Sequence, residues 1–537
     1  MAAQLLDVFS FLSVLLRGLV LAANSVVLGG ILFWLLILPH GKAQVSIRRM
    51  IFWSAIALAA VQIGYVAADS AVLAATTGLQ LNDLAGAGFF LAGSAAACAA
   101  ILIALLSRRG SYSRQWELLV PAAVSSVAVV LTSHAAGRLD HRPVLLCLTA
   151  LHQGATSAWV GGLPYLVLAL KRSDDSTAGI LCSGFSRLAL ISVALLAGSG
   201  LLMSWFYIGS TAAIYGTPYG AMVATKAVLL AMLLFLGGLN FQIVRGSAAT
   251  SARLLATLRR YAEAEIGIGF TVILAAASLT SQPPAADIPG GPVSTADVIQ
   301  RIRPQWPRLE TPPLSALSPV TPLAFGAAGQ PAPGLLSFVP GTSYQPATPS
   351  DIAWSEYNHQ WAGLIVLATG LLAILARSPW TPWARHWPLT FLGLAVFLFL
   401  RADPENWPLG PRSFWQSFAV AEVLQHRIFI LLIVAFAGFE WGVRTGRIVS
   451  RSATMVFPAV CAVGGALLLT HTHSLNNIRG ELLIELSHLP LAVLAVAAGW
   501  SRWLELRLTT PQRGIAAWIW PLCFVLIGAI LLNYREA

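Results

Sequence analysis

Long apolar runs constrain the fold of this chain more than any other feature. About twenty consecutive apolar residues are enough to cross the hydrocarbon core of a bilayer as a helix. Such runs lie near residues 10–38, 50–75, 85–106, 117–134, 143–170, 185–208, 218–244 and 262–280, and then near 358–376, 387–401, 421–442, 454–470, 481–500 and 515–533. We therefore expect an all-α polytopic membrane protein with about 14 transmembrane helices, in two bundles of eight and six.

The composition agrees with a membrane protein and excludes several other classes. Apolar residues make up 57% of the chain and charged residues 10%, with a mean hydropathy of +0.74, whereas soluble domains carry about 25% charged residues. The five cysteines lie in apolar segments without paired spacing, which argues against a disulfide framework. The net charge of +11 is then a signal of membrane topology, and we expect lipid rather than nucleic acid around this chain.

Basic residues give the predicted orientation. Most of the 33 Lys and Arg residues fall in alternate loops between the apolar runs. Loops rich in Lys and Arg face the cytoplasm, so both termini are predicted to be periplasmic.

One long loop, residues 281–350, divides the apolar runs and is predicted to be extracytoplasmic. It holds half of the 30 prolines and contains no His, Cys or Met. Its composition favours an extended tether over a metal-binding domain. The predicted organisation is a four-helix membrane segment at 1–144, a core membrane domain at 145–285, a Pro-rich periplasmic linker at 286–350 and a six-helix membrane domain at 351–537.

The most concentrated polar stretch lies at residues 469–490 and reads LTHTHSLNNIRGELLIELSHLP. His471 and His473 close one apolar run, and Glu481, Glu485 and His488 open the next. At about 100° per helical residue, the last three fall within a sector of roughly 60° on one face. Ionisable groups inside a membrane are costly and indicate function, so we expect metal ligands here. The alternative is a hydrogen-bonded cap where two helices leave the bilayer.

The remaining histidines show the same asymmetry. Of the ten histidines, only His40 and His386 map to the cytoplasmic side of the predicted topology. Imidazole is a ligand for copper, zinc or iron, so the pattern favours capture of a cation from the extracytoplasmic side. The simpler alternative is that histidines favour membrane interfaces. The further candidate ligands are His134, His141, His152, His359, Glu422, His426, Met203 and Met222.

Several of these candidates have specific expectations. Glu422 and His426 have helical i,i+4 spacing, although Arg427 could make them a structural ion pair. His152 lies deep in the fifth run and needs a partner, which His134 or His141 could supply. Thioethers such as those of Met203 and Met222 suit cuprous copper.

Two more charged residues lie deep within apolar runs. Lys226 and Glu265 could mark a path toward the cytoplasm. Their estimated depths differ by about 12 Å at 1.5 Å per residue, which makes a direct bridge doubtful.

Residues 145–285 resemble the copper-resistance protein D family (CopD). The matching pieces are HQGATSAWVGGLPYL (152–166), FSRLALISVALLAGSGLL (185–202), TPYGAMVATKAVLL (217–230), GGLN (237–240) and AEAEIGIGFTVILAAASLTSQPP (262–284). The positions that the resemblance marks are His152, Trp159, Gly161, Gly162, Tyr219, Gly220, Lys226, Asn240 and Glu265. The half beyond residue 350 is similar to the extension of long members. The resemblance implies an inner-membrane protein that handles copper and is often paired with a periplasmic copper carrier.

Two functional hypotheses follow. The first is a copper transporter involved in copper uptake and resistance, which is not an enzyme and has no nucleotide-binding GxxxxGK[ST] loop. The second is a membrane redox or oxidase-assembly module that holds haem or copper, with His426 and His488 as the proposed axial pair for haem. A di-iron site built on Glu485 and His488 would need a second copy of the motif, which the spacing of Glu422 and His426 does not supply.

Overall fold

The protein is all-helical. The computed structural model describes residues 2–39, 43–108, 116–246, 252–288, 292–317, 348–418, 421–470, 478–509 and 512–535. Within these residues the chain forms helices and connecting loops without a named β-strand, which confirms the predicted class.

Among the described residues, the helices before the linker include nine of eight residues or more and four shorter pieces. They are α1 (Ala2–Leu36), α2 (Ala43–Thr77), α3 (Leu81–Leu84), α4 (Gly88–Arg108), α5 (Leu119–Leu131), α6 (His134–Gly137), α7 (Arg142–Thr156), the π-helical turn η2 (Ser157–Gly161), α8 (Leu163–Leu170), α9 (Asp175–Ile208), α10 (Ala212–Gly216), α11 (Pro218–Arg245) and α12 (Ala252–Leu279). The described part of the linker contains η4 (Ala285–Asp287), α13 (Thr295–Ile302) and η5 (Leu314–Ala316).

The helices after the linker form the second half of the chain. They are α14 (Pro349–Leu375), η6 (Pro382–Leu389), α15 (Thr390–Arg401), α16 (Phe414–Ser417), α17 (Ala421–Arg444), η7 (Ala453–Met455), α18 (Val456–Leu468), α19 (Ile478–Arg507) and α20 (Gln512–Leu532).

Eleven helices among the described residues are long and apolar enough to cross a membrane. Each of the other three predicted runs also falls on helix. Two of them, α5 and α18, are shorter apolar helices, and the third is interrupted by η2 between α7 and α8. The total of fourteen spans therefore stays a prediction.

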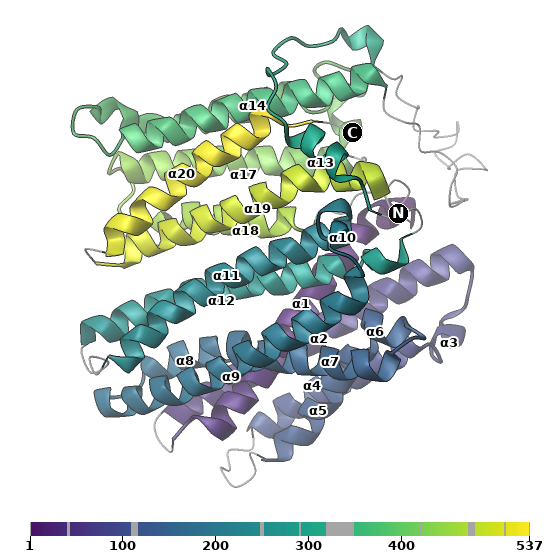
Figure 1. The fold of residues 1–537 in the computed structure, drawn as a ribbon, viewed down its shortest axis with the longest axis vertical. Helices are drawn as coiled ribbons and strands as arrows, with labels where there is room; N and C mark the ends of the chain where they lie inside the picture. The colour runs from purple at the N-terminus through teal and green to yellow at the C-terminus, as the bar shows by residue number, and fades with distance from the viewer. Residues whose placement is uncertain are drawn as a thin grey trace.

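The long helices lie side by side and run across the elongated molecule, and both termini lie at the same end of these helices, on the right of the view (Figure 1). We call this end the outer end and the opposite end the inner end. The common position of the termini agrees with the even number of crossings that the basic residues predict.

The apolar side chains form two main cores, and α19 contributes to both. Leu482 and Val496 belong to the core of the first half, whereas Ala498 belongs to that of the second. The Trp500 indole lies directly over Gly267 of α12, where a Cβ would approach the ring within 1.5 Å. The two halves therefore pack through α19, and the division into separate bundles of eight and six stays a prediction.

Helix α1 and η2 approach each other closely in the first half. A Cβ on Gly161 would lie 1.9 Å from the carbonyl oxygen of Ser25, and one on Gly29 would lie 2.4 Å from that of Ser157. Glycine allows this approach because it has no Cβ. Single π-helical turns inside α-helices frequently occur at functional sites, and this one carries Trp159.

The described part of the linker is not simply an extended tether. The hydroxyl of Tyr215, in α10 of the first half, forms a hydrogen bond with the hydroxyl of Thr295 at 2.7 Å. Arg308 pairs with Glu356 of α14 at 3.4 Å, and the Trp361 indole donates to the Leu309 carbonyl at 3.1 Å. Residues 292–317 thus contact both halves at the outer end.

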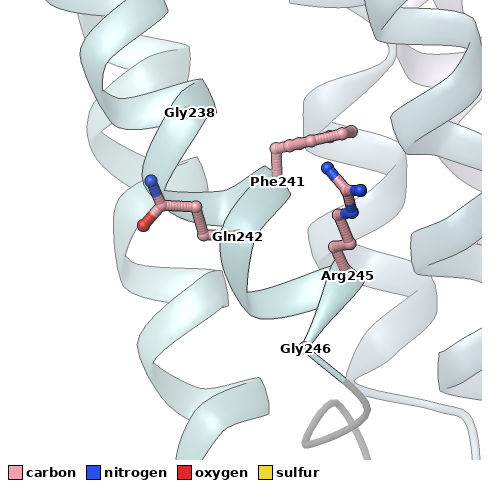
Figure 2. Close-up of a pocket in the computed structure, with 5 residues that line it drawn as sticks. All are labelled: Gly238, Phe241, Gln242, Arg245 and Gly246. Carbon is pink, nitrogen blue, oxygen red and sulfur yellow. The ribbon is translucent and has the colours of Figure 1, made fainter.

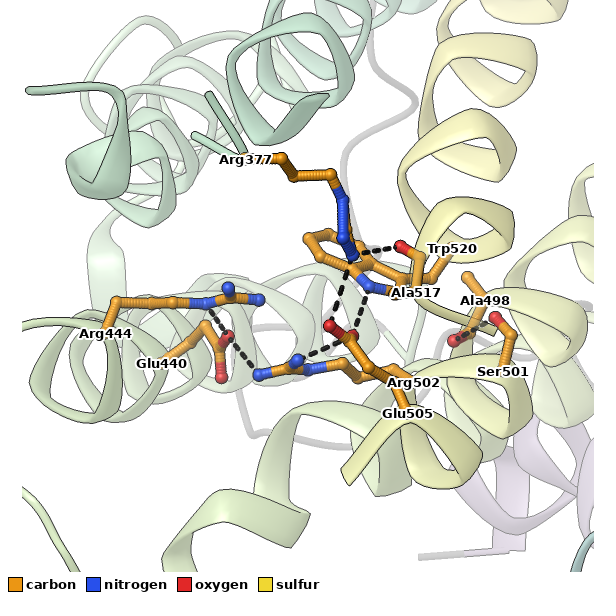
Figure 3. Close-up of polar contacts among 9 residues, drawn as sticks. All are labelled: Arg377, Glu440, Arg444, Ala498, Ser501, Arg502, Glu505, Ala517 and Trp520. Carbon is orange, nitrogen blue, oxygen red and sulfur yellow. Dashed lines mark hydrogen bonds and ion pairs between the residues drawn. The ribbon is translucent and has the colours of Figure 1, made fainter. Parts of the chain in front are cut away.

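A buried ion-pair cluster joins the helices of the second half at the inner end (Figure 3). Its members are Arg377, Glu440, Arg444, Arg502, Glu505 and Trp520. Arg502 donates to Glu505 at 2.6 Å and lies 3.5 Å from Glu440, which also accepts from Arg444 at 2.7 Å. Each charge is paired and hydrogen-bonded, as burial in low dielectric requires.

Candidate functional site

His152 lies inside the first half, on the face of α7 that packs against α9. It is ten residues from the start of α7, or about 15 Å at 1.5 Å per residue. Its Nδ1 lies 3.1 Å from the hydroxyl of Ser199. A hydrogen-bonded partner for this buried imidazole was expected from His134 or His141, and the structure supplies Ser199 from α9 instead.

The hydrogen bonds of Ser199 decide the protonation of the His152 ring. The Ser199 hydroxyl donates to the Leu195 carbonyl at 2.6 Å, so its oxygen is free to accept from His152. Nδ1 then carries the hydrogen, and Nε2 is the acceptor nitrogen. This is the arrangement in which metal-binding histidines are usually held, with one ring nitrogen donating and the other available for the metal.

A thioether lies one helical turn from this imidazole. Met203, four residues after Ser199, accepts a hydrogen bond from Thr149 at 3.7 Å, and Thr149 precedes His152 by three residues. The structure therefore brings the predicted ligands His152 and Met203 to the same α7–α9 interface. Met222 is buried in the core near the start of α11.

A second polar group lies deeper, between η2, α11 and α12. Glu265 is 2% exposed and accepts from the Asn240 amide at 2.5 Å, with the Trp159 indole as its second hydrogen-bond partner. Gly237 of α11 lies beside both groups, since a Cβ there would be in ordinary contact with the carboxylate at 3.6 Å and with the Trp159 ring at 3.8 Å.

This deeper group can receive a cation as well as a hydrogen bond. Asn240 Oδ1 is buried and has no hydrogen-bond partner among the described residues. A carboxylate and an amide oxygen therefore lie together in the middle of the membrane domain. The partners of Glu265 are Asn240 and Trp159 rather than Lys226, in agreement with the difference in depth estimated from the sequence.

The second half brings two predicted ligands together at the outer end. The rings of His359 (α14) and His488 (α19) have centroids 6.1 Å apart. The Tyr534 ring stacks on the His359 ring with centroids 3.8 Å apart, and its centroid lies 6.0 Å from that of His488. Because His359 Nδ1 lies 2.9 Å from the Ser355 carbonyl oxygen, Nδ1 must carry the hydrogen and Nε2 is the acceptor.

Glu485 lies one turn before His488 and links the two halves. It is 5% exposed and accepts from the Gln282 amide at 2.6 Å. Gln282 follows α12, at the beginning of the linker. Neither Gln282 nor Tyr534 was expected at the site, because no spacing rule connects them with α19.

His426 forms a separate pair with a carboxylate from a neighbouring loop. Its Nδ1 lies 2.7 Å from Asp403 Oδ1, and Arg427 donates to the carbonyls of Phe399 and Trp407 at 3.0 and 3.1 Å. The predicted partner Glu422 has its side chain outside the described residues. His426 and His488 thus belong to different contact groups, so the structure offers no support for them as an axial haem pair.

The two histidines near the start of α7 also lie apart. His134 Nε2 donates to the Leu279 carbonyl at 3.2 Å, and burial lowers the pKa of His134. His141 packs against Phe206 with ring centroids 5.1 Å apart. Each of these imidazoles is stabilised locally, as in the alternative that histidines favour membrane interfaces.

The described residues contain no group of three or more His, Cys, Asp and Glu side chains that could hold a metal ion. His471 and His473 lie outside the described residues, as does the Glu481 side chain. Among the described candidates, His152 and Met203 lie one helical turn apart at the α7–α9 interface, and the rings of His359 and His488 are in contact. So few ligands at each position suit a path that passes an ion on better than a site that keeps it.

A hollow of about 490 Å³ at the inner end of α11 is chemically different (Figure 2). Its lining residues are Gly238, Phe241, Gln242, Arg245 and Gly246. Arg245 and Phe241 extend to one side of the helix and Gln242 to the other (Figure 2). These five residues include no carboxylate, imidazole or sulfur ligand, so the hollow is not a candidate for metal capture.

Comparison with known proteins gives a family for the α9–α12 region. Residues 180–279 match the family model described as Copper resistance protein D. A relative, Copper transport protein CutJ from Bacillus subtilis (strain 168), is 33% identical over 161 residues, which are 29% of this chain and 28% of that protein. The matched region thus covers little more than a quarter of this relative's length. No solved structure matches this chain. Through residues 180–279, this chain is therefore similar to the copper-resistance protein D family.

Proposed function

We propose that this protein transports copper across the inner membrane, taking the ion at the outer end and passing it through the core domain. The observation that carries the proposal is the juxtaposition of His152 and Met203 on facing helices inside the membrane. The matching relative is named a copper transport protein, which supports copper as the cargo. Because the predicted orientation puts these ligands toward the periplasm, uptake from that side is the direction we propose.

The chemistry of the two ligands favours copper over harder cations. Imidazole binds copper, and a thioether favours its cuprous form. Ser199 holds the His152 ring through Nδ1 at 3.1 Å, so Nε2 is the ring nitrogen that would accept a metal. A site with few protein ligands binds weakly enough to release the ion, which a transport path requires.

Glu265 and Asn240 provide a deeper position on the same path. Their oxygen atoms lie about 21 Å from the outer end of α12, at 1.5 Å per residue for the fourteen residues to Leu279. An ion leaving His152 would meet a buried carboxylate, which offsets the cost of moving a charge through low dielectric. Lys226 lies eight residues from the start of α11, or about 12 Å at 1.5 Å per residue. This is near the level of His152, where its positive charge would oppose prolonged occupation.

The outer imidazole pair supports a capture step. His359 and His488 come from helices α14 and α19 of the second half, next to Glu485, which bonds Gln282 of the first half. This contact places the second half's ligands beside the end of the core domain. A periplasmic copper carrier delivering the ion to this end is part of the same proposal, as is a role in copper resistance.

Copper accumulation by cells that express single variants tests the proposal. His152→Gln, and separately the double variant His359→Gln with His488→Gln, should slow uptake at least about tenfold, because metal-ligand contacts of this kind are worth such factors. His386→Gln is the matched control, since His386 lies at the inner end and accepts from the Trp441 indole at 2.9 Å.

The control should accumulate copper at the unchanged rate when all variants reach the membrane in equal amounts. Unchanged uptake in both sets of outer variants would refute transport through these residues. A haem absorption band in the purified protein would instead favour the redox module.

A further inference from the structure

A hollow of about 390 Å³ at the outer end lies between α1, α2, the α5–α6 turn and the segment that follows α12. It is separate from the two ligand pairs described above. Its charged lining residues are Arg17, Arg138 and Asp287, and Thr132, His134 and Tyr65 contribute polar side chains. The hollow is therefore lined by two guanidinium groups and one carboxylate.

Arg17 is the buried charge of this hollow. It is 4% exposed, and its guanidinium donates to Thr132 Oγ1 at 2.7 Å and to the carbonyls of Thr132 and Val129 at 3.2 and 3.4 Å. All of these acceptors are neutral. No carboxylate among the described residues lies within the 4.0 Å of an ion pair with Arg17. Asp69 of α2 attracts Arg17 only from beyond that distance. A buried charge without a counterion in contact is costly, so an anion in the hollow would relieve that cost.

Arg138 has only part of its guanidinium occupied. Its Nη2 pairs with Asp287 at 2.6 Å, and its Nη1 is buried without a hydrogen-bond partner among the described residues. The lining thus has one net positive charge, from two arginines and one aspartate. His134 adds no charge near neutral pH, since its Nε2 donates to Leu279 and burial lowers its pKa. Asp69, one turn after Tyr65 on α2, acts on Arg17 from outside the lining.

We propose that this hollow binds a small oxyanion, a carboxylate or phosphate group, between the guanidinium groups of Arg17 and Arg138. Guanidinium groups match the paired oxygens of carboxylate and phosphate, and the Thr132 hydroxyl lies next to Arg17. The phosphate of a lipid headgroup and a free anion share this chemistry. The hollow at the inner end lacks such a pair of guanidinium groups, because Arg245 is the single charged residue of its lining.

Thermal melting of the full-length protein in neutral detergent tests the proposal, with sodium phosphate compared with sodium chloride of equal ionic strength. Phosphate should raise the melting temperature saturably. In Arg138→Gln the apparent affinity for phosphate should fall roughly tenfold, the usual effect of losing one hydrogen bond to a charged group. In Asp287→Asn, which removes the competing carboxylate, the affinity should rise, and Arg245→Gln should match the wild type.

A shift that does not saturate, or one of equal size in Arg138→Gln and the wild type, would overturn the proposal. Because Arg138 and Asp287 lie at the mouth of the hollow, with side chains 22% and 44% exposed, their variants are expected to fold. For each variant, the shift is its melting temperature in phosphate minus its melting temperature in chloride.

Native mass spectrometry separates the two sources of the oxyanion. Retention of phosphatidylglycerol by the wild type, with loss in Arg138→Gln, would identify a lipid headgroup. Saturable phosphate binding without that retention would identify a free anion. Failure of both would refute the inference and would leave the copper proposal untouched, because neither measurement involves copper.

Discussion

Replacing Gly161 by alanine tests how the α1–η2 contact supports the core domain. The new Cβ would lie 1.9 Å from the Ser25 carbonyl oxygen and 2.5 Å from the Ser25 carbonyl carbon. Both atoms belong to the backbone of α1, so no side-chain rotation can make room. Ordinary contacts begin at 3.4 Å, and 3.4 Å minus 1.9 Å means that α1 and η2 must separate by about 1.5 Å.

The energetic cost follows from that displacement. Overpacking a well-packed interior costs about 1–3 kcal/mol, occasionally more, and backbone on both sides places Gly161→Ala at the upper end. Alanine recovers about 0.5–1 kcal/mol through its greater helix propensity. We therefore expect a net loss of about 2 kcal/mol or more in the free energy of unfolding.

Function should suffer more than stability. Gly161 lies two residues after Trp159, whose indole bonds Glu265, so a shift of η2 separates that pair. The assays are the melting temperature of the purified protein in detergent and copper accumulation at equal expression. Gly154→Ala is the matched control, because a Cβ on Gly154 of α7 would meet nothing within 4 Å.

The control should melt at the wild-type temperature or slightly above it, and should transport normally. Equal melting temperatures for Gly161→Ala and Gly154→Ala would refute the reasoning, since the two changes have the same chemistry and differ only in the available space.

Two further predictions concern histidines. Ser199→Ala removes the acceptor for His152 Nδ1 and should weaken copper binding roughly 10- to 100-fold in titrations against a competing chelator. Ser199→Thr keeps a hydroxyl and should restore the copper affinity. Equal copper affinity in the wild type and both variants would contradict the role of Ser199. Burial lowers the pKa of His134 in the folded protein. As the pH drops below the unfolded pKa of about 6.5, the unfolded chain binds a proton that the folded chain resists. The free energy of unfolding therefore decreases as the pH is lowered. His134→Gln keeps a donor for the Leu279 carbonyl and should show a smaller loss of melting temperature between about pH 7.5 and about pH 5.5; an unchanged pH dependence would exclude His134 as its source.

Much of the architecture could be predicted because it depends on local pattern. Runs of apolar residues long enough for a bilayer identify helices wherever they occur, and every predicted run falls on helix. Length alone did not reveal that the run at 143–170 contains η2, the turn on which α1 packs through Ser25 and Gly161. The deep position of Glu265 could likewise be estimated by counting residues along a helix.

The site is harder to predict because its contacts are long-range. His152 was identified from the sequence, but its partner Ser199 is on another helix, and Tyr534 is 175 positions from His359, on which it stacks. His426 bonds Asp403 from a neighbouring loop, a partner that no helical spacing could reveal, and its predicted pairing with Glu422 stays a prediction.

The amino-acid sequence by itself determined which segments can enter a membrane, the common side of the two termini and the excess of imidazoles toward one end. These follow from the cost of placing polar groups in hydrocarbon, which each segment meets on its own. Only the tertiary structure decided which of those imidazoles meet, because that depends on which helix faces pack together. Contacts such as Gly161 on Ser25 and Trp500 on Gly267 set those faces, and they join residues that no periodicity along the chain connects.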